Sequence, residues 1–425
     1  MSIISSIKRI QQSKDAQRVF ANFSYLSLLQ IGSYVLPIIT YPYLAKVIGV
    51  AGFGKIAFAM SLIVYFMTIT DWGYNFTATR DVARNRENQE KISTIYSIVT
   101  TSKLCLLLIS TIVLAIIIIF IPYLRENSIV IIFSFTMVIG YTIFPEWLFQ
   151  GLENMKLIVI LNLLSKLLFT ILIFIFIQKP NDFILQPLFS GLGYIISGII
   201  SLIYIQKKLK IKFQLCTIKE VKQSIKGSFD VFLNNLMPNL YNSFSVMILG
   251  FCNGSIANGL LDGANKFYSI CAQFLTVLSR AFFPFLSRKI EMHSIFVKIK
   301  FSIMIFFALL LILGAKILVI NILDPSFEAA IIPLQILGVS LIFHSLVNIY
   351  GTNYLIIIGE ERLLRKITMC VSILGFFCAF PLIYFYSYIG AACTIALARI
   401  ILGITVVYIA KQKMKTLKGS LSNKA

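Results

Sequence analysis

Polar and charged side chains recur at helical spacing inside long apolar stretches of this sequence. Residues three or four positions apart lie on one face of an α-helix. A charge inside a lipid bilayer costs roughly 3 kcal/mol unless it meets a partner or a wet cavity, so we expect such faces to be turned inward. The clearest of these faces consists of Lys266, Ser269, Gln273, Thr276 and Arg280.

Four cations in these stretches are candidates for binding an anionic group. Lys166 and Arg399 lie near the middle of their apolar stretches, and Lys266 and Arg280 lie nearer to the ends. Ammonium and guanidinium groups in a wet cavity hold phosphate oxygens through charge-assisted hydrogen bonds. We therefore predict that they bind an anionic substrate. A lysine near the end of a span can instead extend to the headgroup region, and for Lys103 both alternatives stay open.

Uncharged polar side chains are expected to complete the wall of this cavity. Amides and hydroxyls replace the hydration that a charged or sugar-bearing group loses when it leaves water. The amides that we assign to the cavity are Gln273, Asn234, Asn242, Asn348 and Asn75.

Four titratable groups could carry a coupling ion. Asp71, Glu146 and Asp230 lie toward the ends of their apolar stretches, and His344 lies near the middle of one. The acids either bind an ion or form ion pairs that fix helix packing, and both readings are open. His344 either exchanges a proton or hydrogen-bonds a neighbouring Ser or Asn within the bundle.

The elements that carry these residues are expected to be membrane-spanning helices. Of the 425 residues, 58% are hydrophobic and 13% are charged, which is about half the charged fraction of a soluble domain. Apolar runs of roughly 18 residues or more recur, and lipid leaves backbone groups no partner outside a helix or a closed barrel. The sequence predicts an all-α polytopic membrane protein with twelve transmembrane helices, at 20–43, 53–73, 96–122, 128–149, 157–178, 184–206, 227–251, 264–286, 298–321, 329–357, 366–387 and 388–410.

The net charge of +21 is distributed unevenly over this topology. If the N-terminus is cytoplasmic, most basic residues between the spans or at their ends, among them Arg80, Lys300 and the run from Lys207 to Lys226, fall on the cytoplasmic side. This bias is the positive-inside rule, and it predicts that both termini are cytoplasmic. The charge therefore indicates topology, with some attraction to anionic lipid, and argues against a nucleic-acid partner.

The longest connection between predicted spans divides the chain at its midpoint. We predict a cytoplasmic segment at 1–19, an N-lobe of six spans at 20–206, a basic linker at 207–226, a C-lobe of six spans at 227–410 and a basic tail at 411–425. Two short matches suggest that the lobes are repeats, because Pro37 and Gly49 have the same separation as Pro238 and Gly250. Proline-interrupted spans at matching positions are typical of transporter binding sites.

Motifs for cofactor and metal chemistry are absent from the sequence. Residues 49–56 resemble a phosphate-binding loop, but Ile56 stands where Ser or Thr must hold magnesium. The two histidines and seven cysteines have no metal-ligand spacing. We expect no cofactor and no metal.

Two neighbouring segments resemble a known family. These are LPIITYPYLAKVIGVAGFGKIAFA at 36–59 and TDWGYNFTATRDVAR at 70–84. Together they resemble the Wzx-type O-antigen and polysaccharide flippases of the multidrug/oligosaccharidyl-lipid/polysaccharide exporter superfamily. The twelve-span layout extends the likeness over most of the chain.

This resemblance implies two six-helix lobes that form a V-shaped, alternating-access transporter in the bacterial inner membrane. Its implied cargo is an undecaprenyl-diphosphate-linked oligosaccharide, moved from the cytoplasmic to the periplasmic leaflet, with ion coupling and with polysaccharide assembly proteins as partners. The main alternative is a multidrug or small-molecule exporter of the same superfamily. A membrane polysaccharide polymerase or ligase is disfavoured because the predicted outer loops are short. We therefore expect a transporter and not an enzyme.

Overall fold

The computed structural model describes residues 14–288 and 290–422, and every regular element in this part of the chain is a helix. Nine helical stretches among these residues are long and apolar enough to cross a membrane. The all-α, membrane-spanning architecture is therefore confirmed. The longer elements are α2 (Lys14–Asp71), α3 (Tyr74–Arg84), α4 (Gln89–Phe120), α6 (Ser128–Ile143), α8 (Met155–Phe176), α9 (Leu185–Lys207), α10 (Ile218–Leu236), α11 (Ser243–Arg288), α12 (His293–Leu313), α14 (Ile331–Leu346) and α15 (Glu361–Ser422).

The helices α2, α11 and α15 each contain an internal residue whose backbone is not helical, so each is two helices joined by a sharp turn. The turns are at Gly49 (φ 63°, ψ −177°), Gly254 (φ 79°, ψ −172°) and Ser387 (φ 51°, ψ −131°). Glycine suits the first two because it has no Cβ to clash at positive φ. Dividing these helices makes the count consistent with the twelve predicted spans, provided that the seventh also includes the end of α10 and the 3-10 helix that follows it.

Shorter helices connect the long ones. A 3-10 helix at Met237–Leu240 separates α10 from α11, so the predicted span 227–251 is interrupted at Pro238, which cannot donate a backbone hydrogen bond. The other short elements are α5 (Pro122–Glu126), α7 (Glu146–Gly151), α13 (Ala315–Ile317), the π-helices η4 (Leu318–Leu323) and η6 (Val347–Leu355), and 3-10 helices at Pro180–Ile184, Ile290–Met292 and Pro325–Ala330.

The described residues form two compact units. The first contains the described chain up to Thr40, Phe66–Gln178 and Ile184–Phe232. The second contains Tyr41–Tyr65, Lys179–Phe183 and the described chain from Leu233 onward. The predicted N-lobe and C-lobe, with their linker at 207–226, stay a prediction.

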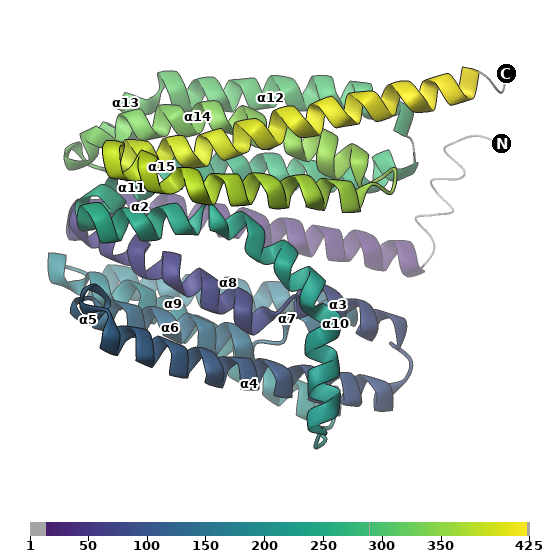
Figure 1. Ribbon diagram of the computed structural model, residues 1–425. Helices are drawn as coiled ribbons and strands as arrows, with labels where there is room; N and C mark the ends of the chain where they lie inside the picture. The colour runs from purple at the N-terminus through teal and green to yellow at the C-terminus, as the bar shows by residue number, and fades with distance from the viewer. Residues whose placement is uncertain (1–13, 289, 423–425) are drawn as a thin grey trace. The chain divides into compact units, whose positions relative to one another are not determined.

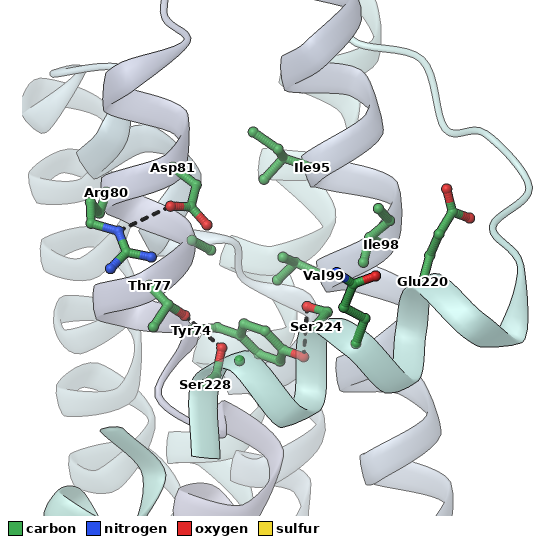
Figure 2. A pocket seen from close by; sticks show the side chains of 13 residues that line it. Tyr74, Thr77, Arg80, Asp81, Ile95, Ile98, Val99, Glu220, Ser224 and Ser228 are labelled. Carbon is green, nitrogen blue, oxygen red and sulfur yellow. Dashed lines mark hydrogen bonds and ion pairs between the residues drawn. The ribbon is translucent and has the colours of Figure 1, made fainter. Parts of the chain in front are cut away.

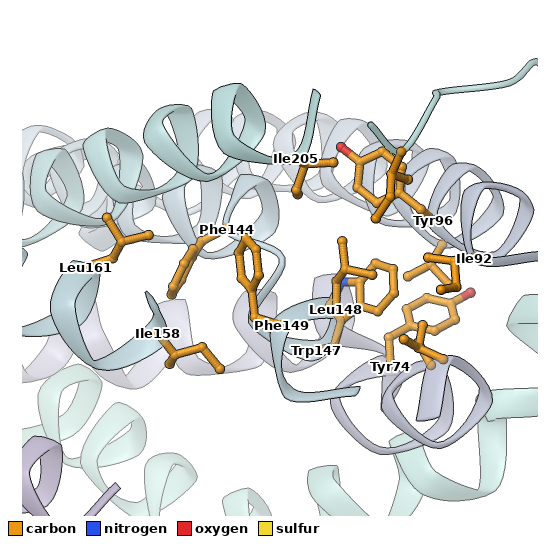
Figure 3. Packing of buried hydrophobic residues seen from close by; sticks show 14 residues of the cluster. Tyr74, Ile92, Tyr96, Phe144, Trp147, Leu148, Phe149, Ile158, Leu161 and Ile205 are labelled. Atoms are coloured by element: carbon orange, nitrogen blue, oxygen red, sulfur yellow. The ribbon is translucent and has the colours of Figure 1, made fainter. Parts of the chain in front are cut away.

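In the first unit, α6 and α8 pack on α9, and α3 packs on the short helix α7. Aromatic side chains gather where α3, α4 and α7 meet, with Trp147 at 1% exposure beside Tyr74 and Tyr96 (Figure 3). The Thr79 hydroxyl also donates to the Trp147 carbonyl at 3.1 Å. Gly151 lets these helices approach closely, because a Cβ there would lie 2.8 Å from the Val82 side chain. This packing fixes α3 relative to α7.

The second unit contains a close crossing of two helices that begin at Gly49 and Gly254. A Cβ on Gly54 would overlap the carbonyl oxygen of Ser255, and a Cβ on Gly259 would overlap the carbonyl oxygen of Val50. Gly54 lies five residues after Gly49 and contacts Ser255, which follows Gly254. In the same way, Gly259 lies five residues after Gly254 and contacts Val50, which follows Gly49. The contact is therefore reciprocal, like the two halves of a two-fold interface.

This crossing corrects the register of the predicted repeat. The residue with the same backbone turn as Gly49 is Gly254, whereas Gly250 has no positive φ and lies in a helix against Phe58. The predicted match of Gly49 with Gly250 is therefore wrong by four residues. A proline–glycine spacing repeated once is too short a pattern to fix the register.

Candidate functional site

Two acids and two lysines gather inside the first unit. Asp71 ends α2, Lys103 lies on α4, Glu146 begins α7 and Lys166 lies on α8. Lys103 interacts electrostatically with both acids, and Glu146 also interacts with Lys166. Because the numbers of acidic and basic groups are equal, the ionised cluster has no net charge, which lowers the cost of burying it in a membrane.

Lys103 lies at the centre of this cluster. Its side chain is 2% exposed, and its ammonium group lies 5.3 Å from the ring centroid of Tyr141 and 3.4 Å from the Tyr141 carbonyl oxygen, to which it donates. The hydroxyl of Tyr141 in turn accepts a hydrogen bond from Asn75 at 2.5 Å. Lys103 therefore points into the unit and does not extend to the headgroups. Its central position was missed because its depth was judged only from its distance to the end of a span.

A cavity of about 410 Å³ adjoins the cluster between α3 and α7. It brings together two residues predicted from the sequence, Asn75 and Glu146. It also contains Arg80, which the sequence analysis assigned only to topology and which pairs with Asp81 at 3.0 Å. Amide, hydroxyl, carboxylate and guanidinium groups in one cavity can hydrogen-bond sugar hydroxyls. The full lining is Asn75, Phe76, Thr79, Arg80, Ala83, Glu146 and Gln150.

A second cavity, of about 370 Å³, lies between α3, α4 and α10 (Figure 2). Two hydrogen bonds cross it and tie α10 to α3: Ser224 donates to the Tyr74 hydroxyl at 3.1 Å, and the hydroxyls of Thr77 and Ser228 lie 2.8 Å apart. Isoleucine and valine side chains of α4 form its opposite wall. The sequence predicted no binding role for any residue of this cavity, and Arg80 was expected only to contribute to topology.

Arg399 is the centre of a polar group in the second unit. It is 8% exposed and donates to Ser340 Oγ and to Asn242 Oδ1, both at 3.1 Å. Its guanidinium carbon lies 4.1 Å from the ring centroid of Tyr268. None of the ion pairs between described residues involves Arg399, so these neutral partners leave its positive charge uncompensated. The sequence predicted both Arg399 and Asn242, and the structure brings them together.

Two further residues of this unit lie near Arg399. His344 lies edge-on to Tyr268, with ring centroids 6.3 Å apart, and interacts electrostatically with Arg399 and Lys300. Lys300 is 0% exposed and donates to the Ser279 hydroxyl. Lys300 was expected only to contribute to the charge of the cytoplasmic side, and the structure shows that its side chain points into the helix bundle. The second unit thus contains two buried cations close to His344.

The remaining predicted residues are placed as follows. Lys266 forms an ion pair with Asp262 at 3.0 Å, so its charge is compensated within α11. Asn348, in the π-helix η6, donates to Thr276 at 3.4 Å. The side chains of Gln273, Asn234, Arg280 and Asp230 are exposed on α10 and α11, and their assignment to one cavity stays a prediction.

Comparison with known proteins places the chain in a family. A family model described as "Polysaccharide biosynthesis protein" matches residues 19–290. The chain is 30% identical over 383 residues to a "Putative O-antigen transporter" of Escherichia coli (strain K12), covering 88% of this chain and 92% of that protein. It is also 30% identical over 392 residues to a protein of the same description from Shigella dysenteriae, covering 90% and 97%.

Solved structures show the same fold at low sequence identity. The "Lipid II flippase MurJ, inward closed conformation" matches with a TM-score of 0.69 and 16% identity, covering 91% of this chain and 87% of MurJ. A MATE transporter in complex with MaD3S matches with a TM-score of 0.59 and 14% identity, covering 94% and 96%. The relatives are transporters and not enzymes, as expected. The chain therefore belongs to the polysaccharide biosynthesis protein family, which confirms the resemblance to the O-antigen and polysaccharide flippases.

Proposed function

We propose that the protein is a flippase for undecaprenyl-diphosphate-linked O-antigen or polysaccharide repeat units. It moves them from the cytoplasmic to the periplasmic leaflet of the bacterial inner membrane, and both of its termini are cytoplasmic. The two relatives described as O-antigen transporters support this substrate class. Polysaccharide assembly proteins would then act on the delivered units.

The observation that carries this proposal is the buried, uncompensated charge of Arg399. A diphosphate cannot enter hydrocarbon unaided, because the loss of its hydration is too costly. Arg399 is held by the neutral side chains of Asn242, Ser340 and Tyr268, so its guanidinium is available to a phosphate without competition from a protein carboxylate. In this proposal, Lys166 and Arg280 add positive charge, and Lys266, although paired with Asp262, offers its ammonium group as a hydrogen-bond donor. The amides Gln273, Asn234, Asn348 and Asn75 bind sugars.

We also propose that transport is coupled to an ion through the buried cluster of the first unit. Asp71 and Glu146 share Lys103 as their cation, so adding or removing one proton changes the net charge of a group buried in the membrane. A change in the net charge of a buried group is costly unless a second charge, such as that of the substrate, moves at the same time. This cost would couple ion binding to substrate movement. Asp230 is exposed and supports this role less well; His344 stays a second candidate.

A deletion strain tests the proposed function. Loss of a flippase is expected to accumulate carrier-linked glycan in the cytoplasmic leaflet and to remove the surface glycan. Both are measured by extracting the carrier lipids and by staining surface polysaccharide. A normal surface glycan in this strain would contradict the proposal, and drug sensitivity with a normal glycan would favour the multidrug-exporter alternative.

Arg399→Ala tests the proposed substrate site. We expect at least a tenfold loss of surface glycan with membrane protein at its normal level, since about 1.5–3 kcal/mol is typical of a hydrogen bond to a charged group. Lys316→Ala is the matched control, because Lys316 is an exposed cation outside the group around Arg399. Equal export by both variants would remove Arg399 from the substrate site.

A further inference from the structure

The connection between α9 and α11 forms a basic, partly apolar surface. The chain leaves the apolar helix α9 at Lys207, and α10 is not one of the nine membrane-spanning stretches. In Figure 1, α10 runs across the direction of the long helices α4, α6 and α9 of the same unit. A helix that crosses the direction of the spans and carries lysines beside apolar side chains is typical of the headgroup region. Its surroundings are rich in exposed lysines, which are Lys207, Lys208, Lys210, Lys212, Lys219, Lys222 and Lys226.

The segment before α10 is held in place by α4. Gln89 donates to the Leu209 carbonyl at 2.8 Å, and the backbone N–H of Gln214 donates to Ser97 at 2.8 Å. Ile211 is buried in the core of the first unit. The side chains of Leu215 and Ile218 remain 99% and 75% exposed. Fixed apolar side chains among lysines are typical of a segment that rests in the headgroup region.

An open, shallow cavity of about 410 Å³ lies on one face of α10 within this surface. It is lined by Lys222, Ile225, Lys226, Phe229 and Asp230. The two lysines are four residues apart, so their ammonium groups lie on the same side of the helix. Phe229 is 45% exposed and supplies an apolar wall below them. Two cations and one carboxylate leave the cavity positive, and an apolar wall beside them suits an amphiphile with an anionic head.

We propose that this cavity binds the headgroup phosphate of an anionic phospholipid of the surrounding bilayer. The ammonium groups of Lys222 and Lys226 hold the phosphate oxygens, and the acyl chain passes over Phe229 into the membrane. Basic pockets at the cytoplasmic ends of transmembrane helices are known to take up anionic headgroups. The site is separate from the buried charges to which we assign substrate binding and ion coupling.

The bound lipid would stabilise α3 through α10. Trp72 Nε1 donates to the Ile225 carbonyl at 2.9 Å, and the Trp72 ring stacks on Phe232 with centroids 4.1 Å apart. The hydroxyls of Thr77 and Ser228 join the same two helices. Ile225 thus lines the lipid cavity and also accepts a hydrogen bond from Trp72, which lies between α2 and α3.

Lipid binding by the purified full-length protein tests the site. Native mass spectrometry with phosphatidylglycerol and phosphatidylethanolamine as probes measures how many lipids bind and how tightly. We expect the wild type to prefer phosphatidylglycerol, and Lys222→Gln/Lys226→Gln to weaken its binding about fivefold for each lysine removed. Lys222→Arg/Lys226→Arg keeps both charges and should retain the preference.

Lys207→Gln/Lys212→Gln is the matched control, because it removes two exposed charges from the same surface outside the cavity. Retained phosphatidylglycerol binding in this variant supports a defined site. Equal losses in the two glutamine variants would show diffuse attraction and overturn the proposal. It would also be overturned if Lys222→Gln/Lys226→Gln lost binding of undecaprenyl diphosphate but kept phosphatidylglycerol, since the cavity would then serve the carrier lipid. An unchanged melting temperature in lipid-free detergent shows that the variants fold.

Discussion

Replacing Gly54 or Gly259 with alanine is expected to remove most of the protein from the membrane and to lower its melting temperature markedly. The added methyl group would overlap the carbonyl oxygen of Ser255 or of Val50, and backbone atoms cannot move aside as a flexible side chain can. Overpacking of this kind costs about 3 kcal/mol or more. Membrane abundance and thermal unfolding in detergent measure the effect.

Gly227→Ala is the control for this prediction. Gly227 lies within α10, and a Cβ there would meet no atom within 4 Å, so alanine should be neutral or slightly stabilising. The double variant Gly54→Ala/Gly259→Ala is expected to lose less than the sum of the two single losses, because either methyl group already forces the helices apart. Additive losses would contradict a shared crossing.

Replacing Lys103 with methionine is expected to destabilise the protein by about 3–5 kcal/mol, as measured by thermal unfolding in detergent. Methionine is unbranched and only one atom shorter than lysine, and it removes both the charge and the hydrogen bond to the Tyr141 carbonyl. Asp71 and Glu146 would then be buried near one another without the cation that faces both. The loss of the cation should affect Asp71 more than Glu146, because Asp71 Oδ1 is buried and has no hydrogen-bond partner among the described residues.

A second substitution distinguishes lost charge balance from lost packing. Lys103→Met/Asp71→Asn removes one acid as well, so it should recover much of the stability that Lys103→Met loses. Export should stay impaired in the double variant, because the proposed ion-coupling cluster has lost two members. No recovery would mean that the loss comes from the missing hydrogen bond to the Tyr141 carbonyl or from the shorter side chain, and not from the unbalanced acids.

The sequence was sufficient for the helical architecture and for individual polar residues. Apolar runs separated by basic segments report spans directly, because lipid allows few other structures. Arg399 was identified because a guanidinium near the middle of an apolar run needs polar partners, and Asn242 proved to be one of them. The ion pair of Lys266 with Asp262 could have been predicted as well, because their spacing of four residues places them on one helical face.

The sequence could not show which lysine side chains are buried in the bundle, or which glycines match between the predicted repeats. Lys103 and Lys300 lie near the ends of apolar runs, and whether such a side chain points into the bundle or out of it depends on neighbouring helices that are distant in the chain. Gly250 was matched to Gly49 because its separation from Pro238 equals that of Gly49 from Pro37. Only the reciprocal contact of Gly54 and Gly259 decides between Gly250 and Gly254.

The two buried charge groups would respond differently to the voltage across the membrane. A unit charge that crosses the full potential gains or loses about 2.3 kcal/mol per 100 mV. The ionised cluster of two acids and two lysines in the first unit has no net charge, so displacing it as a whole does almost no electrical work. Arg399 is different, because its charge is unbalanced by any ion pair among the described residues. Movement of Arg399 along the membrane normal would therefore make part of the transport cycle electrogenic, unless an anionic substrate travels with it.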